Sequence, residues 1–532
     1  MKGRNKIFTP LLISIACAAG LILGARMNFD TSDELFSANP KKQKLNRLID
    51  YIDYEYVDDV NTDSIVDITV NKILENLDPH SVYIPKEEYA AVTDNMKGDF
   101  VGIGVSFYNV GDTIVVIKAL EGGPSEKIGI RGGDRILYAN GNRLFNTGIS
   151  NDSITNQLKG KENTKVTLKV LRKGLKDMLT FNVKRGKVPL KSVDAAYMLT
   201  DDLGYIKVNR FSETTYAEFK TSISELKKMG AKQIALDLRD NPGGYLSEAI
   251  NIADEFIGGE KLILFTKNKS GAIEETYAQR KGEFENGKVF VLINENSASA
   301  SEVVAGALQD NDVGTIVGRR SYGKGLVQRE MELGDGSAVR LTIARYYTPT
   351  GRSIQKPYDL GNESYFNDYM RRYKNGELSN EDNIEVNDSL RFTTPEGKTV
   401  YGGGGIIPDV FVPKYTDSEK EKINFLLRSG YMSRFVFDIL ERDRQYYNSV
   451  SREDFVEEIE ITEEMIDGFE TYILLERDLR INLNVKKHKP LLKKYLKAEM
   501  AQQLFGTNAF QRYLNEDDRI IEKVIELSEE IE

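Results

Sequence analysis

Apolar and polar residues alternate with two different periods between about residues 204 and 318. Short continuous apolar runs, as in QIALDLR (233–239) and KVFVLIN (288–294), are typical of buried strands. The segments between such runs, for example TYAEFKTSISELKKMG (215–230), repeat their apolar residues at helical spacing. Strands that alternate with helices predict a βαβ-type sheet layered with helices. The β-rich stretch that follows, residues 326–351, predicts antiparallel strands added to the same domain.

The pattern changes on both sides of this region. LNRLIDYIDYEYV has helical spacing, whereas the residues beyond Lys97 form short β-like runs that glycines interrupt. A polar, weakly patterned stretch indicates a long insertion, and the end of the chain carries charged, amphipathic helical runs. The sequence therefore predicts a multi-domain α/β protein with these parts: an N-terminal apolar segment (1–26), a helical segment (27–92), a small β-rich unit (93–187), the layered core (188–415, with the insertion 356–401) and a helical region (416–532).

The first residues have the layout of a secretory signal or a membrane anchor. Three basic residues, Lys2, Arg4 and Lys6, precede an apolar run that ends near Ala25. No small-x-small cleavage pattern follows cleanly, so retention as an anchor is favoured over removal. Lipidation at Cys17 is disfavoured, because Ser14 stands where an apolar residue is expected. Either way, the rest of the chain is predicted to face the outside of the cytoplasmic membrane.

Composition excludes several function classes. The 532 residues carry a formal charge of −10 and no large basic cluster, which argues against nucleic acid as the main partner. The chain has one cysteine and two histidines, His80 and His488, so a disulfide framework and an imidazole- or thiolate-based metal site are not expected. With so few histidines, any serine nucleophile needs another base.

The stretch SASAS, residues 297–301, lies where a predicted strand meets a predicted helix. Unpaired N–H groups and the positive end of the helix dipole at such a junction can stabilise an oxyanion. The same residues also match a capping box, from Ser299 to Glu302. Taken alone, this stretch favours the plain helix cap.

Two further stretches carry candidate chemistry. The turn NPGG, residues 241–244, ends another predicted strand and should expose a second set of N–H groups at the sheet edge where ligands bind. In GRRSYGKGLVQ, Lys324 stands between glycines, and a desolvated lysine can act as a base near neutral pH. Gln328 falls on the same face of an extended strand and could hold the amine.

The same stretch comes close to a phosphate-binding loop. Gly318, Gly323 and Lys324 match G-x-x-x-x-G-K, but Gly325 stands where a Ser or Thr belongs, and a strand rather than a helix is predicted to follow. Nucleotide binding is therefore a distant alternative.

Together these motifs resemble the carboxyl-terminal processing peptidases, which are tail-specific serine endopeptidases with an inserted PDZ domain. The resemblance covers roughly residues 40–415 and rests on motifs in a fixed order. They are LDPHSVYIP (77–85), GIGV (102–105), LDLRDNPGG (236–244), NENSASASEVVAGALQD (294–310), GRRSYGKGLVQ (318–328), LTIARYYTPTGRSIQ (341–355) and GGGIIPDV (403–410).

The resemblance implies a site as well as a fold, namely a layered protease core with an inserted PDZ domain. It places the nucleophile on Ser299, the base on Lys324 and an orienting glutamine on Gln328. It places the oxyanion hole on the N–H of Ala300 and of one glycine in the NPGG turn, Gly243 or Gly244. Neither a metal nor an organic cofactor is implied. The substrate would be a protein or peptide with a free C-terminus.

Residues 93–187 resemble the PDZ domain itself. Such domains bind a peptide's terminal carboxylate on backbone N–H groups and add the peptide as a strand to a sheet edge. The positions that match the carboxylate loop are Gly102, Ile103, Gly104 and Val105. The expected protein is a membrane-anchored serine endopeptidase of the periplasmic side, and a homo-oligomer or an adaptor protein are further possible partners. The rival hypothesis is a non-catalytic peptide-binding scaffold.

Several residues near the motifs are predicted to be structural. Ser297 and Ser301 are assigned to loop hydrogen bonding, His80 to capping or packing, and Tyr346 and Tyr347 to the core rather than to a substrate groove. His488 is expected on the surface. For the insertion and the C-terminal region the default expectation is ordinary solvated helices, with partner binding, gating of the site or holding an oligomer together as alternatives.

Overall fold

The computed structural model describes residues 40–414, 418–476 and 485–530, which form two compact units that divide after Leu74. The predicted signal or anchor segment, 1–26, lies outside the described residues. The first unit contains α2 (Pro40–Glu55) and α3 (Thr62–Leu74), as the helical spacing predicts. Residues Val82–Ile84, within the segment predicted to be helical, instead form strand β1 of the second unit, followed by α4 (Lys86–Lys97).

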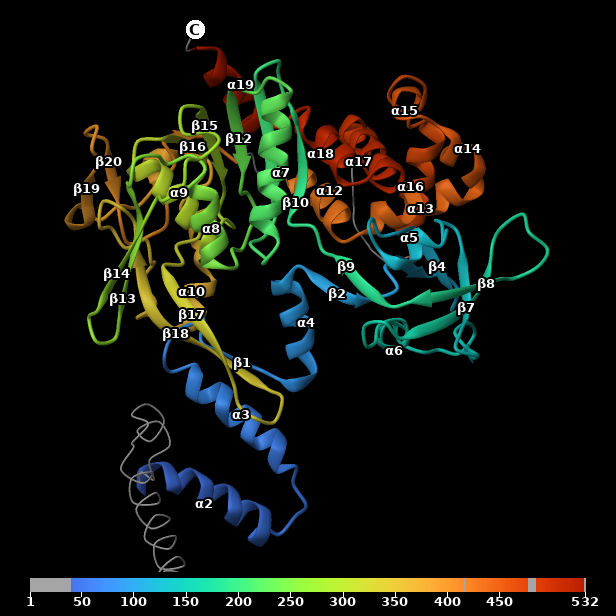
Figure 1. The fold of residues 1–532 in the computed structure, drawn as a ribbon, viewed down its shortest axis with the longest axis horizontal. Coiled ribbons are helices and arrows are strands. Elements are labelled where there is room, and N and C mark those ends of the chain that lie inside the picture. The colour runs from blue at the N-terminus through green and yellow to red at the C-terminus, as the bar shows by residue number, and fades with distance from the viewer. Residues whose placement is uncertain (1–39, 415–417, 477–484, 531–532) are drawn as a thin grey trace, which may run out of the picture. The chain divides into compact units, whose positions relative to one another are not determined.

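The predicted βαβ sheet is the centre of the second unit (Figure 1). Its order is β10-β11-β12-β15-β16-β21, and all neighbours are parallel except β10 with β11. The strands are β10 (Val193–Met198), β11 (Leu203–Val208), β12 (Gln233–Asp237), β15 (Lys288–Ile293), β16 (Gly314–Gly318) and β21 (Val410–Phe411).

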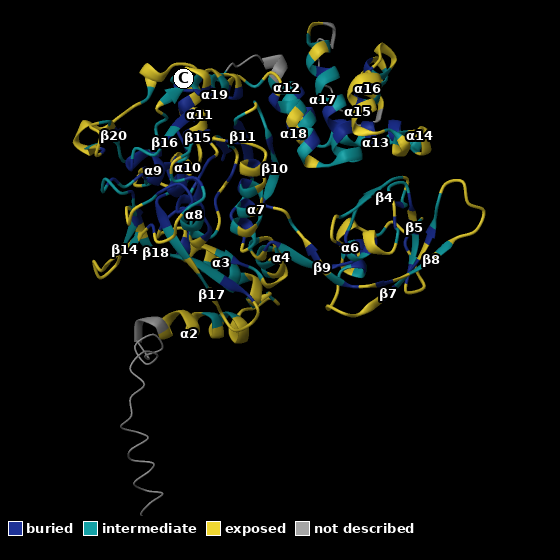
Figure 2. Cartoon of the chain, turned by 45° about the horizontal axis from the view of Figure 1, so that its top comes forward, coloured by how far each residue is buried: buried dark blue, intermediate teal, exposed yellow. Residues whose placement is uncertain are grey.

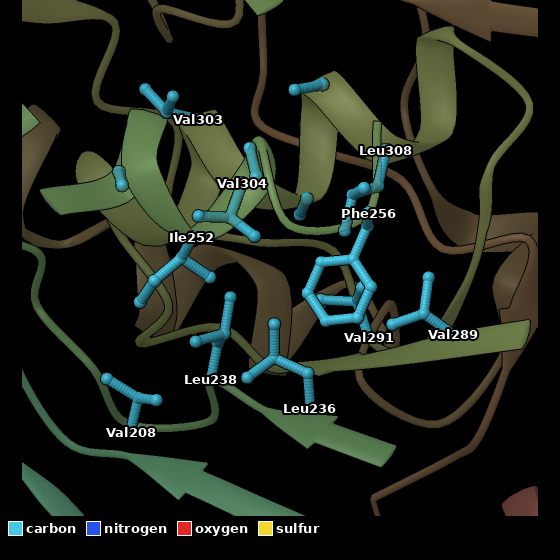
Figure 3. Close-up of a cluster of buried hydrophobic side chains, with 14 of the residues drawn as sticks. Val208, Leu236, Leu238, Ile252, Phe256, Val289, Val291, Val303, Val304 and Leu308 are labelled. Atoms are coloured by element: carbon cyan, nitrogen blue, oxygen red, sulfur yellow. The ribbon is translucent and has the colours of Figure 1, made fainter. Parts of the chain in front are cut away.

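Helices cover both faces of this sheet. Leu236 and Val291 point to one face, where α7 (Thr215–Lys228), α8 (Leu246–Ala253) and α9 (Ala300–Asp310) complete an apolar core (Figure 3). Alternate residues such as Phe290 pack on the opposite face against α19 (Arg519–Glu529). The side-chain period of two along each strand produces the two layers.

The predicted antiparallel strands form a second sheet. Its order is β1-β18-β13-β14, with β17 paired to the other side of β18. The remaining strands are β13 (Leu262–Asn268), β14 (Ile273–Tyr277), β17 (Leu326–Glu332) and β18 (Ala338–Tyr347). The pairing places Gln328 opposite Thr342, and the strand β1 runs along the same β18. This sheet therefore brings the LDPHSVYIP segment beside the segment that carries Gln328.

The β-rich unit has a core of its own. Its sheet has the order β3-β4-β5-β7-β8, with β6 paired to β5, and β3 is an edge strand. The elements are β3 (Val105–Asn109), β4 (Ile114–Ala119), α5 (Pro124–Lys127), β5 (Arg135–Ala139), β6 (Asn142–Arg143), α6 (Asn151–Leu158), β7 (Lys165–Leu171) and β8 (Leu179–Lys184). A two-stranded ribbon of β2 (Asp99–Gly102) and β9 (Gly186–Pro189) connects it to the rest of the chain.

The insertion and the C-terminal region are not simply solvated, and that default expectation is wrong. The insertion contains α10 (Asn362–Phe366), α11 (Asp368–Lys374) and a ribbon of β19 (Arg391–Thr393) and β20 (Thr399–Tyr401), and it buries Arg372 and Tyr365. The C-terminal helices enclose a separate apolar core, and α19 closes one face of the central sheet (Figure 2). The helices before α19 are α12 (Ser418–Arg428), α13 (Tyr431–Arg442), α14 (Arg444–Ser449), α15 (Arg452–Glu458), α16 (Glu463–Glu476), α17 (Val485–Phe505) and α18 (Thr507–Asn515).

The strongly charged composition of the C-terminal region favoured the expectation of solvated helices. The charged side chains occupy only the outer faces of these amphipathic helices, and the inner faces form the core. His488 is half-buried on α17 rather than exposed. In the part of the chain that the structure describes, no helix combines the length and apolar character needed to cross a bilayer.

Candidate active site

Ser299 lies in the short loop between β15 and the start of α9. Its φ of +56° is a conformation that residues with a side chain adopt rarely, and such strain is typical of functional turns. The Ser299 N–H donates to Glu302 Oε2 at 2.8 Å, so the reciprocal arm of the predicted capping box is present. Ser299 is half-buried, whereas every residue of α9 is buried. The loop therefore presents one serine at the edge of a rigid core.

The NPGG turn contacts this loop directly. The Asn241 carbonyl accepts hydrogen bonds from the Ala298 N–H and from Ser301 Oγ, both at 3.0 Å. A β-carbon on Gly243 would lie 2.8 Å from the Ser299 Cβ, and Gly243 has a φ of +100°. A glycine is therefore needed for the turn to approach the serine so closely. The Gly243 N–H donates to Asn241 Oδ1 at 2.8 Å.

Lys324 extends from the loop that follows β16 and precedes β17. Its Nζ donates to Gln328 Oε1 at 2.9 Å, as the spacing of the two residues predicts. Gln328 Nε2 donates in turn to the backbone carbonyl of His80, which fixes the orientation of the amide. Burial, and secondarily the positive charge of Arg340, lowers the pKa of Lys324 to about 8. A substantial fraction of this amine is thus neutral slightly above physiological pH.

Glu302 connects the serine loop to the lysine loop. Besides the Ser299 N–H, its carboxylate accepts hydrogen bonds from Ser321 Oγ (2.5 Å), the Gly323 N–H (2.6 Å) and the Lys324 N–H (2.8 Å). The side chain is fully buried, and burial raises its pKa while these donors oppose the rise. The capping box was the only sequence signal for this residue, and that signal predicts just one of the four contacts.

Tyr346 joins the same two loops from the second sheet. Its hydroxyl lies within hydrogen-bonding distance of the carbonyls of Ser299 (3.2 Å) and Lys324 (3.1 Å). The ring is buried in the core, as predicted, and Tyr347 stacks on Phe265 with ring centres 4.9 Å apart. The bridging role of the Tyr346 hydroxyl has no signal in the sequence, because it depends on how two sheets meet.

His80 contacts the Lys324–Gln328 pair through its backbone carbonyl. Its N–H donates to Asp78, and its ring Nε2 pairs with the Tyr365 hydroxyl at 2.7 Å. Burial, with the positive charges of Lys324 and Lys356, lowers the pKa of His80 to about 3, so the ring is neutral at physiological pH. The packing role predicted for His80 is confirmed, and its carbonyl adds a contact to Gln328 that the sequence did not reveal.

The remaining predictions around the loops concern hydrogen bonding and alternative ligands. Ser297 Oγ donates to the Leu238 carbonyl at 2.8 Å, so Ser297, like Ser301, has the structural role assigned to it. The strand β17, not a helix, follows Lys324, and Glu302 already occupies N–H groups that a phosphate would need. Across the described residues, no group of three or more His, Cys, Asp or Glu side chains is placed to hold a metal ion.

The predicted carboxylate loop precedes edge strand β3. Gly102, Ile103 and Gly104 are buried, and the carbonyls of Ile103 and Gly104 accept hydrogen bonds from Ser125 (2.9 Å) and Leu120 (3.0 Å). Val105 begins β3, whose outer edge has no partner strand in the described sheet. The loop and the unpaired start of this strand edge thus adjoin, as the binding of a peptide terminus requires. At the other end of β3, the Asn109 carbonyl accepts a hydrogen bond from Arg434 of α13 at 3.3 Å.

Comparison with known proteins identifies the family. Residues 202–360 match the model of peptidase family S41, and residues 101–184 match that of the PDZ domain. The chain is 32% identical over 359 residues to the carboxy-terminal processing protease CtpA of Bacillus subtilis, covering 67% of this chain and 76% of the relative. This chain belongs to the S41 carboxy-terminal processing proteases. It is a serine peptidase with a PDZ domain, and the scaffold alternative is not favoured.

This S41 protease is also similar to two other named proteins and to one family of unknown function. A probable CtpA-like serine protease of Staphylococcus aureus is 35% identical over 313 residues, which is 58% of this chain and 62% of the relative. The solved photosystem II D1 C-terminal processing protease is 26% identical, with a TM-score of 0.36 and coverage of 70% of this chain and 86% of that one. Residues 422–506 match a family of unknown function, DUF8443.

Proposed function

We propose that this S41 protease hydrolyses peptide bonds with Ser299 as nucleophile and Lys324 as general base. Neutral Lys324 takes the proton of Ser299 Oγ as the oxygen attacks the substrate carbonyl, and the resulting ammonium then protonates the leaving amine. Water repeats the sequence to release the acyl group. The observation that carries this proposal is the buried Lys324 amine, held on Gln328 at 2.9 Å with its pKa lowered to about 8.

The oxyanion formed in this reaction needs donors beside Ser299. We assign them to the N–H of Ala300, the first residue of α9, and to a glycine N–H of the adjoining NPGG turn. The Gly243 N–H is engaged by Asn241 at 2.8 Å, which favours Gly244 over Gly243 as the second donor. Backbone donors fixed in this way stabilise developing charge without reorganisation.

The PDZ domain is proposed to select the substrate's free C-terminus. Gly102, Ile103, Gly104 and Val105 would receive the terminal carboxylate, and the tail would pair with the edge of β3. The name of the Bacillus subtilis relative, a carboxy-terminal processing protease, supports cleavage at or near C-termini. An extracytoplasmic location with residues 1–26 as anchor remains part of the proposal, and the two further partners, a second copy or an adaptor protein, remain predictions.

The catalytic proposal is tested with the full-length protein in mild detergent and a disordered test protein that has an apolar C-terminus. Intact mass spectrometry follows cleavage by the native enzyme, Ser299→Ala and Lys324→Ala. We expect cleavage only by the native enzyme, with losses on the order of a thousandfold in both variants. Cleavage by Ser299→Ala at the native rate would show that another residue is the nucleophile.

A further inference from the structure

One buried arginine of the insertion 356–401 makes several contacts to the loop that carries Lys324. Arg372, on α11, is 1% exposed. Its Nη1 donates to the carbonyls of Arg320 (3.2 Å) and Ser321 (2.7 Å), and its Nη2 donates to the carbonyl of Tyr322 (3.4 Å). Three consecutive carbonyls just before Gly323 and Lys324 therefore point to a single guanidinium.

The guanidinium is itself held by carboxylates. Arg372 Nε lies 2.8 Å from Asp368 and 3.8 Å from Glu377, and Glu377 also pairs with Arg320 at 2.6 Å. A buried charge is tolerated only when it is paired and hydrogen-bonded. The planar guanidinium fork meets several carbonyls at once, which an ammonium group cannot do.

The opposite side of this loop is held by the helix that follows the nucleophile. Glu302 accepts from the N–H groups of Gly323 and Lys324, while the Gly323 carbonyl accepts from the Lys356 N–H at 3.0 Å. The carbonyls of residues 320–323 thus face the insertion, and the N–H groups at 323 and 324 face α9. Both faces of the loop are constrained, so the origin of the Lys324 side chain is fixed.

A second path from the insertion leads to Gln328. The Tyr365 hydroxyl pairs with His80 Nε2 at 2.7 Å, and the His80 carbonyl accepts from the Gln328 amide. The Lys356 ammonium lies over the Tyr365 ring at 4.2 Å from its centre. Arg372 and Tyr365 therefore act on the two ends of the Lys324–Gln328 pair.

The geometry points to the insertion as a working part of the catalytic apparatus, with Arg372 as a positioning residue that aims Lys324 at Ser299. This inference rests on the proposed role of Lys324 as the base. It gives the insertion a task that its weakly patterned sequence does not suggest. Arg372 does not touch the reacting atoms and acts only through the backbone of residues 320–322.

The test compares Arg372→Lys with Arg371→Lys, its neighbour on α11, whose side chain is half exposed. Arg372→Lys keeps the charge facing Asp368 and Glu377 but loses the fork. The full-length proteins are assayed on a quenched fluorescent peptide across the pH range, together with their melting midpoints. We expect Arg372→Lys to lower kcat by about tenfold or more with KM nearly unchanged, since small displacements of catalytic groups are costly.

The pH profile separates positioning from mere stabilisation. A displaced Lys324 is less desolvated, so the pH midpoint of kcat/KM should move upward from about 8 in Arg372→Lys, while Arg371→Lys follows the native profile. A lower melting midpoint with native kcat and native pH midpoint would overturn the inference. Should Arg372→Lys fail to fold, Tyr365→Phe decides: it keeps the ring, and native kcat and pH midpoint in that variant would also overturn the inference.

Two further comparisons distinguish a failure of this inference from a failure of the proposed catalytic function. If Lys324→Ala retains native kcat, the proposed base is wrong and the role of Arg372 is wrong with it. If Lys324→Ala and Ser299→Ala are inactive but Arg372→Lys matches the native enzyme in kcat and pH midpoint, the catalytic proposal stands and only the inference about Arg372 is wrong.

Discussion

Lys324 has an amine whose protonation is governed by its surroundings. Burial and Arg340 disfavour the ammonium, whereas Glu302 and Asp78 favour it, and burial is the largest influence. Since the proposed base must be neutral, activity should rise with pH through a midpoint near 8. Gln328 is suited to this balance because its oxygen orients the amine without adding a negative charge.

Replacing Gln328 by glutamate tests whether the neutral side chain at this position helps to keep the pKa of Lys324 low. Gln328→Glu would place a carboxylate where the amide oxygen lies 2.9 Å from Lys324 Nζ, and an opposite charge favours the protonated amine. We expect the pH midpoint of kcat/KM to move up by about one unit or more, so that the rate at pH 7 falls about tenfold and recovers at higher pH. Steady-state kinetics from neutral to alkaline pH measure this shift. An unchanged midpoint would mean that Lys324 is not the titrating group.

At the scale of elements, the site is a junction of two strand ends rather than a single motif. Along the chain, α9 precedes β16 and the loop before β17 follows it. Glu302 joins the start of α9 to this loop by accepting four hydrogen bonds. All four donors are N–H or O–H groups, so this position requires acceptors only. A carboxylate fulfils that requirement and an amide does not.

Glu302→Gln should therefore disturb both loops while keeping the size of the side chain. The amide NH2 would face donors and leave at least one buried N–H unpaired, which costs about 1–3 kcal/mol. We expect lower stability in urea unfolding and a loss of kcat of about tenfold or more, because the two loops would shift relative to each other. Glu363→Gln, at an exposed position of α10, is the control. Native kcat in Glu302→Gln would show that the loops hold their positions without it.

The sequence predicted the elements of this junction better than their connections. Local signals predicted the strand ends and turns that carry Ser299, the NPGG turn and Lys324, whereas the proposed roles of Ser299 and Lys324 came from the family resemblance. The His80 carbonyl lies 248 positions from Gln328 along the chain, and the Tyr346 hydroxyl lies 47 positions from Ser299. Such contacts follow from the register of the second sheet, which no local pattern specifies. The contacts of Arg372 were not predicted for the same reason, because it lies in a stretch whose composition predicts a solvated insertion.

At the scale of the whole chain, the proposed function assigns two tasks to separate parts. The catalytic loops belong to the layered core, whereas the carboxylate loop belongs to a unit with its own sheet and apolar core. Recognition of the tail and cleavage should then respond to different substitutions. Removing the proposed nucleophile makes recognition measurable, since the bound tail is then not consumed.

The last prediction uses full-length Ser299→Ala and a fluorescent peptide that ends in an apolar residue, as the free acid and as the amide. The free acid should bind at least about tenfold more tightly, because charge-assisted hydrogen bonds from the N–H groups at residues 103–105 require the carboxylate. Adding Lys324→Ala to Ser299→Ala should leave the Kd unchanged, since Lys324 lies outside the PDZ core. Fluorescence anisotropy measures both. Equal affinity for acid and amide would show that the carboxylate loop is not the tail site, and substrate selection would then have to reside in the layered core that carries Ser299.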